Sequence, residues 1–174
     1  AVRYAENALA ILENLPPGYE LAYAYCNRAN LHMLHEESTE AIRFASRAIE
    51  MVKQFGVQKG FPTETLINSL NSIGVSLLMD QEESWRWGTD CAITPPGLNA
   101  GRAELEKSLE LALQHDYDEH AARAYTNLAC QAVIQRDYVQ AARYLEAGIA
   151  YCYERDLDSW CLFMTAYRAR MQFE

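Results

Sequence analysis

The residues that could do chemistry in this sequence are few and widely spaced. His32 and His35 lie three residues apart, a spacing that places two imidazoles on one face of a helix, where they could bind a metal ion. No cysteine or obvious third ligand lies nearby, and His32 falls at a position expected to pack inside a helical hairpin. A structural role is therefore favoured, and we expect no metal site and no cofactor.

Motifs for catalysis are absent from the sequence. It contains no G-x-x-x-x-G-K-[ST] phosphate-binding loop, no G-x-S-x-G nucleophile turn and no H-E-x-x-H zinc motif. The five cysteines form no C-x-x-C pair, so neither a disulfide framework nor a zinc ribbon is expected. We therefore predict that the cysteines are buried, reduced thiols and that the protein is cytoplasmic. Because no catalytic motif is present, we also predict that it is not an enzyme. The cysteines are Cys26, Cys91, Cys130, Cys152 and Cys161.

Asparagines recur at helical positions where they are poor helix formers. Asn27 and Asn127 occupy the same place in a repeated pattern, and amides on a concave face could bind a peptide backbone or a carboxylate. Hydrogen bonds to neighbouring helix ends or to water are the alternative. The predicted ligand-binding groove consists of Tyr23, Asn27, Asn30, Asn71, Arg123 and Asn127.

The segment from Gln81 to Gly97 has neither helical nor strand periodicity and is predicted to be an irregular insertion. It contains two of the three tryptophans, Trp85 and Trp87. Long irregular loops often contact partners, which makes these residues a candidate interaction loop. The alternative, which we favour, is that both indoles fold back onto the helices, because exposed indoles are costly.

Composition and charge exclude several classes of function. The chain has 174 residues, of which 50% are hydrophobic, with 15 bases against 24 acids and a net charge of −9. Such acidity disfavours binding to nucleic acid or to an anionic membrane, and no apolar run is long enough to span a bilayer. Residues 61–116 hold three bases and nine acids, so the acidity is concentrated there, where it could attract a basic partner.

Small residues recur in the sequence at intervals typical of stacked helical hairpins. Ala29, Gly74, Ala129 and Ala169 are separated by 45, 55 and 40 residues, and small residues allow two helices to approach closely. The predicted fold is all-α: a single tetratricopeptide-like helical-hairpin solenoid over residues 1–174, with about seven helices. Such an array offers a concave surface for a partner, and a homo-oligomer is left open.

The helices can be placed from their periodicity and their stop signals. An N-terminal helix that lacks its hairpin partner ends before Pro16-Pro17-Gly18. Three hairpins and a last helix follow. The predicted ranges are Arg3–Leu15, Tyr19–His35, Thr39–Phe55, Thr63–Met79, Leu98–His115, Asp118–Gln135, Tyr138–Arg155 and Asp158–Phe173.

Several segments resemble the helical-repeat region of bacterial LuxR-type transcriptional regulators with an ATPase module. They are Asp118–Ala129, Asp137–Leu145, Gly148–Cys152, Asp156–Trp160, Tyr4–Glu6 and Leu15–Gly18. The resemblance implies a fragment of a longer protein, in which the nucleotide-binding and DNA-binding modules flank a region that senses effectors or partner proteins. A free-standing tetratricopeptide adaptor that binds a peptide or partner protein is the alternative. The insertion at residues 81–97 departs from the family pattern.

Overall fold

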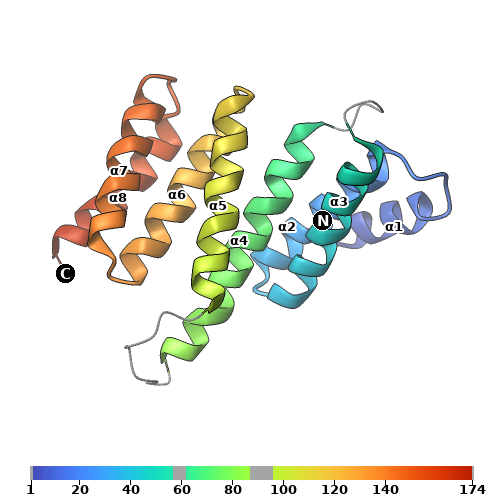
Figure 1. The fold of residues 1–174 in the computed structure, drawn as a ribbon, viewed down its shortest axis with the longest axis horizontal. Coiled ribbons are helices and arrows are strands. Elements are labelled where there is room, and N and C mark those ends of the chain that lie inside the picture. The colour runs from blue at the N-terminus through green and yellow to red at the C-terminus, as the bar shows by residue number, and fades with distance from the viewer. Residues whose placement is uncertain (1, 57–61, 87–95, 174) are drawn as a thin grey trace. The chain divides into compact units, whose positions relative to one another are not determined.

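The computed structural model describes residues 2–56, 62–86 and 96–173, and these residues form eight α-helices and no strand (Figure 1). The chain is therefore all-α in its described part, as the sequence predicts. The helices are α1 (Val2–Leu12), α2 (Tyr19–Leu34), α3 (Ser38–Phe55), α4 (Thr63–Arg86), α5 (Pro96–Gln114), α6 (Asp118–Ile134), α7 (Tyr138–Tyr153) and α8 (Asp158–Phe173).

The helices form two compact units, residues 1–104 and residues 105–174. In the first unit α2 packs against α1, α3 and α4, and α3 packs against α4. In the second unit α6 and α7 pack against each other and both pack against α8. Within each unit, neighbouring helices thus pack against each other, and α2 with α4 and α6 with α8 also pack across one helix, which is a contact pattern of repeated hairpins. The single domain predicted over residues 1–174 stays a prediction.

Four turns between helices share one backbone conformation. Glu36, Asp116, Arg136 and Asp156 have φ between 54° and 62°, in the left-handed region that non-glycine residues rarely adopt. After each of them, the next residue's N–H donates to a carbonyl five residues back, at 2.9–3.0 Å. That hydrogen bond satisfies a carbonyl at the end of the helix. The last three turns are spaced by 20 residues, so the structure shows a regular repeat at half the 40-residue interval read from the sequence.

Other helix ends follow from local sequence. Pro16 and Pro17 lie between α1 and α2, where proline cannot donate a backbone hydrogen bond. Gly56 ends α3 with a φ of 60°, a backbone angle that glycine adopts without steric cost.

Close helix contacts occur where the sequence has small residues. A Cβ atom added to Gly101 of α5 would lie 2.9 Å from the carbonyl oxygen of Gly74 in α4. One added to Gly148 of α7 would lie 2.9 Å from Cβ of Tyr125 in α6 and 2.6 Å from Sδ of Met164 in α8. Of the small residues predicted at helix contacts, Gly74 does lie at a close approach, to Gly101, whereas Ala169 is exposed.

The segment predicted to be irregular is partly helical. The helix predicted to end at Met79 continues to Arg86, and α5 begins at Pro96, so 81–86, 96 and 97 are helical. Trp85 lies in the last turn of α4, whereas Trp87 lies outside the described residues, and their role as an interaction loop stays a prediction. Within the described residues, no helix combines the length and apolar character that crossing a membrane requires.

Candidate functional site

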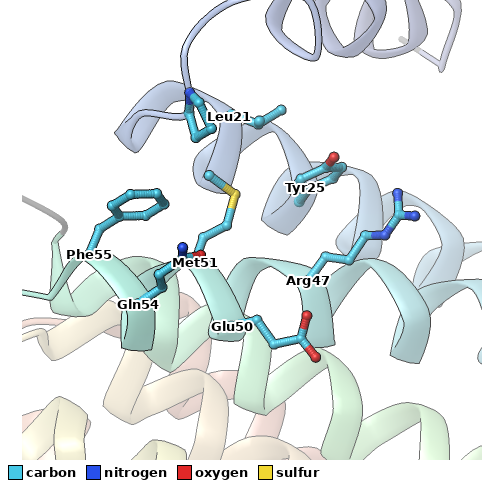
Figure 2. Close-up of a pocket in the computed structure, with 8 residues that line it drawn as sticks. Leu21, Tyr25, Arg47, Glu50, Met51, Gln54 and Phe55 are labelled. Carbon is cyan, nitrogen blue, oxygen red and sulfur yellow. The ribbon is translucent and has the colours of Figure 1, made fainter.

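A pocket of about 260 Å³ opens in the first unit between α2 and the C-terminal half of α3 (Figure 2). Its apolar wall is formed by Leu21 of α2, Met51 and Phe55 of α3, and Pro17 of the linker between α1 and α2. Figure 2 shows Met51 extending from α3 toward α2. Away from the linker, α2 and α3 pack closely through small buried residues, among them Cys26, Ala29, Ala45 and Ala48. Near the linker the two helices leave the space that forms the pocket.

Polar groups lie on one side of the pocket. Tyr25, Arg47, Glu50 and Gln54 complete its lining. Figure 2 shows Arg47 and Glu50 on adjacent turns of α3. Among the described residues Glu50 forms no ion pair, and its side chain is exposed. The pocket therefore presents an apolar wall beside a carboxylate.

Arg47 and Tyr25 are held by Glu13, which follows α1. The Tyr25 hydroxyl donates to Oε1 of Glu13 at 2.9 Å, and Nη1 of Arg47 lies 3.9 Å from the same oxygen. The Arg47 guanidinium also lies over the Tyr25 ring, 5.6 Å from its centre. These contacts tie α1, α2 and α3 together and give the polar side of the pocket a defined geometry.

The environment of Tyr25 keeps its hydroxyl protonated. Burial is the largest cause that raises the pKa of this phenol above 10.0, followed by its hydrogen bond to Glu13 and the charge of that carboxylate. Arg47 acts in the opposite direction. The Tyr25 hydroxyl is therefore a hydrogen-bond donor at neutral pH.

The predicted groove residues do not line this pocket. On α2, Tyr23 and Asn27 are two residues removed from Leu21 and Tyr25, which places them on the other side of the helix. Tyr23 is exposed, and its ring lies 6.0 Å from that of Tyr19. The pocket residues were missed because Leu21, Tyr25 and Met51 have the spacing of ordinary core positions. Pro17 beside an apolar turn was the one available signal.

Asn30 and Asn71 lie where α2 meets α4. Asn30 accepts a hydrogen bond of 2.6 Å from the Ser72 hydroxyl, and Asn71 is 3% exposed. Ser69, a neighbour of these residues on α4, donates to the backbone carbonyl of Thr65 one turn earlier. The amide of Asn30 thus bonds to a side chain of the neighbouring helix α4, a partner that neither the groove prediction nor its alternative named. The groove as a whole stays a prediction.

Arg123 and Asn127 belong to the second unit and lie half-buried on α6. A cluster of polar side chains in this unit lies at the start of α6. Asp118 accepts from the Tyr151 hydroxyl at 2.5 Å and from Nε of Arg155 at 3.0 Å. The Arg155 guanidinium lies 3.8 Å from the centre of the Tyr151 ring. This cluster connects the end of α7 to the start of α6, and we interpret it as a structural contact rather than a binding site.

Of the two histidines, His32 packs between α2 and α3. Its ring stacks on Phe44 with centres 5.3 Å apart and planes 6° apart, and its Nδ1 contacts the Glu37 carboxylate. Within the described residues, no group of three or more His, Cys, Asp or Glu side chains could hold a metal ion.

The chain was compared with known proteins. No family model, curated protein or solved structure matches it.

Proposed function

We propose that this chain is a helical-repeat binding module, the protein-interaction or effector-sensing region of a LuxR-type transcriptional regulator. The pocket between α2 and α3 carries the binding part of the proposal, because it combines an apolar wall with an exposed carboxylate on a rigid pair of helices. The four equivalent turns support a tetratricopeptide-like solenoid. The regulator part rests on the sequence resemblance.

The size of the pocket favours a partner protein over a metabolite. Small-molecule sites usually enclose roughly 300–1,000 Å³, and this pocket encloses about 260 Å³. That space suits one large apolar side chain of a peptide or helix. Glu50 and the net charge of −9 favour a basic residue beside that side chain.

A binding selection tests this proposal. A random peptide library is selected against the wild-type chain, and the recovered peptides are then measured against two variants. Gln54→Trp fills the pocket from its exposed rim, whereas Lys53→Trp places the same bulk on a neighbouring exposed position that does not line it. We expect Gln54→Trp to weaken binding by roughly tenfold or more, the effect typical of losing a buried anchor. Equal binding to both variants would refute the pocket's role.

A second variant tests the charge complementarity. Glu50→Gln keeps the shape of the pocket and removes its carboxylate. Since an exposed ion pair contributes about 0.2–1 kcal/mol, binding of peptides with a basic residue should weaken by up to about fivefold. Peptides without a basic residue serve as the control and should bind unchanged. If both groups respond alike, Glu50 does not select for charge.

The alternative is a free-standing tetratricopeptide adaptor that binds a peptide or partner protein. Both readings use the same pocket, so binding data do not separate them. The domain order of the parent gene does: flanking ATPase and helix-turn-helix modules are expected for the regulator, and the absence of both would contradict it. In either case we propose a cytoplasmic, non-enzymatic module that has no cofactor, does not itself contact nucleic acid and does not bind membranes.

A further inference from the structure

Two cysteines of the second unit lie at matching positions on either side of one turn. Cys152 of α7 lies five residues before Leu157, and Cys161 of α8 lies five residues after Asp156, where Asp156 and Leu157 belong to the turn. The Leu157 N–H donates to the Cys152 carbonyl at 3.0 Å, and the Cys161 N–H donates to the Leu157 carbonyl at 3.1 Å. Because helices joined by so short a turn run antiparallel, residues equally far from the turn lie opposite each other.

The two preceding turns of this unit show that helices approach closely at these positions. The same pair of hydrogen bonds recurs there, with every bond 2.9 Å long. The corresponding positions hold Ala112 and Ala121 before and after the first turn, and Ala132 and Ala141 at the second; all four are buried. Small buried residues allow two helices to lie close together. Among the described turns of this kind, the one between α7 and α8 is alone in having a cysteine at both positions.

A contact one helical turn away shows which faces of α7 and α8 meet. A Cβ atom added to Gly148 of α7 would lie 2.6 Å from Sδ of Met164 in α8, so these two residues face each other. Cys152 lies four residues after Gly148 and Cys161 lies three residues before Met164, which places the cysteines on the same two faces. Burial is the largest cause that raises the pKa of Cys152 to about 11, and the charge of Cys161 is the next, which agrees with neighbouring thiols.

We propose that Cys152 and Cys161 are a redox-sensitive pair, which hydrogen peroxide converts into a disulfide that pins the end of α7 to the start of α8. Both residues are free thiols in the structure. A disulfide needs Cα atoms about 4.4–6.8 Å apart, and facing positions on closely packed helices meet this requirement. Disulfides in the cytosol are usually transient and redox-sensing, so the bond is expected to reopen with thiol reductants. The proposal is independent of ligand binding in the α2–α3 pocket.

The reaction balances with hydrogen peroxide as its oxidant. Because burial disfavours the Cys152 thiolate, Cys161 reacts first. Its thiolate attacks one peroxide oxygen, the O–O bond breaks, hydroxide leaves and a sulfenic acid forms on Cys161. The Cys152 sulfur then attacks the sulfenic sulfur and displaces hydroxide, which takes up the proton of the Cys152 thiol and leaves as water. Overall the two thiols lose two electrons and two protons, and hydrogen peroxide is reduced to two waters.

Tryptic mapping of the full chain after treatment with hydrogen peroxide tests the pairing. Remaining thiols are alkylated before digestion, so that disulfides do not exchange. Cleavage after Arg143, Arg155 and Arg168 places the two cysteines on separate peptides, 144–155 and 156–168. We expect mass spectrometry to find these peptides joined, and dithiothreitol to separate them. Recovery of both peptides unjoined from the oxidised chain would overturn the proposal.

A variant with the same number of thiols is the matched control. Cys161→Ala/Leu162→Cys moves one thiol a single position along α8, which rotates it by about 100° around the helix to an exposed site. Folding should be retained, because the corresponding Ala141 is already alanine. We expect the two peptides to become joined roughly tenfold or more slowly than in the wild type, because the thiols no longer face each other. Equal rates would mean that closeness in sequence suffices, which would contradict the facing pair.

Thermal unfolding tests whether the bond pins the two helices. A disulfide that closes the ring 152–161 restricts the unfolded chain, so the oxidised wild type should unfold roughly 5 °C or more above the reduced form. Cys152→Ala, which introduces the residue found at Ala132, should unfold at the same temperature after either treatment. An oxidised wild type that unfolds at or below the temperature of the reduced form would overturn the pinning of α7 to α8.

Discussion

Replacing Gly101 with alanine should destabilise the protein, although alanine is the better helix former. Gly101 lies in α5 where this helix meets α4. An added Cβ would lie 2.7 Å from Cγ of Leu78 and 2.9 Å from the carbonyl oxygen of Gly74. Both distances are shorter than ordinary contacts, and the carbonyl belongs to a helix backbone that cannot rotate away. The two helices must therefore separate locally to admit the methyl group.

The expected size follows from two opposing effects. Glycine to alanine inside a helix favours folding by about 1 kcal/mol. Overpacking a close contact costs typically 1–3 kcal/mol. The difference predicts a net loss of roughly 0–2 kcal/mol in the free energy of unfolding for Gly101→Ala.

Chemical denaturation followed by circular dichroism measures this loss. A useful control repeats the substitution in a Leu78→Ala background, where the side chain that the methyl group meets has been shortened. Because part of the clash is removed, Gly101→Ala should cost less there than in the wild type. A gain near the full 1 kcal/mol of helix propensity in the wild-type background would refute the close approach of α4 and α5 at this position.

Three further predictions concern turns, the Asp118 cluster and a buried thiol. Arg136→Gly should raise stability by about 0.5–1 kcal/mol, because glycine adopts the left-handed conformation of this residue without strain. Asp137→Gly is the control and should bring no gain, because the φ of Asp137 is −82°; thermal unfolding compares the two variants. Asp118→Asn should lower stability by about 0.5–1.5 kcal/mol, because the hydrogen bond that the carboxylate accepts from Tyr151 loses its charge assistance, and no loss would show that this bond is dispensable. Burial, followed by the charges of Cys161 and Glu119, raises the pKa of Cys152 from 9.0 to about 11. The free energy of unfolding should therefore fall as the pH rises from 9 to 11, because in this range the thiol ionises in the unfolded chain before it does in the folded one. Cys152→Ala should show a shallower decline, and an identical pH profile would contradict this assignment.

The helices could be predicted from the sequence because their signals are local. Apolar periodicity, Pro16 and Pro17 after α1, and small residues at crossings such as Gly148 depend on residues close in the chain or on a repeated pattern. The extension of α4 to Arg86 was missed because the residues beyond Met79 are mostly polar and carry no apolar period. A helix that has already formed can extend through such residues, because adding a residue to a helix costs less free energy than nucleating a new helix.

The candidate site could not be predicted in the same way. Leu21, Tyr25 and Met51 have the spacing of core residues, and whether such residues fill a core or line a pocket depends on how far apart two helices lie. The contact between Tyr25 and Glu13 spans the proline linker, whose path the sequence does not specify. Asparagine is unusual inside a helix, and Asn30 does form a side-chain hydrogen bond, with Ser72 of α4.

Methionine methyl groups offer the most direct test of the central claim, that the α2–α3 pocket receives an apolar side chain of a partner. Met51 lines the pocket in the first unit, whereas Met164 is buried in the second unit and reports on nonspecific effects. The chain is labelled at its methionine methyl groups and titrated with a peptide from the selection described above, and the methyl resonances are followed by NMR. We predict that the Met51 resonance shifts in a saturable manner while that of Met164 stays in place. A saturable shift elsewhere with an unchanged Met51 resonance would contradict the assignment of the site.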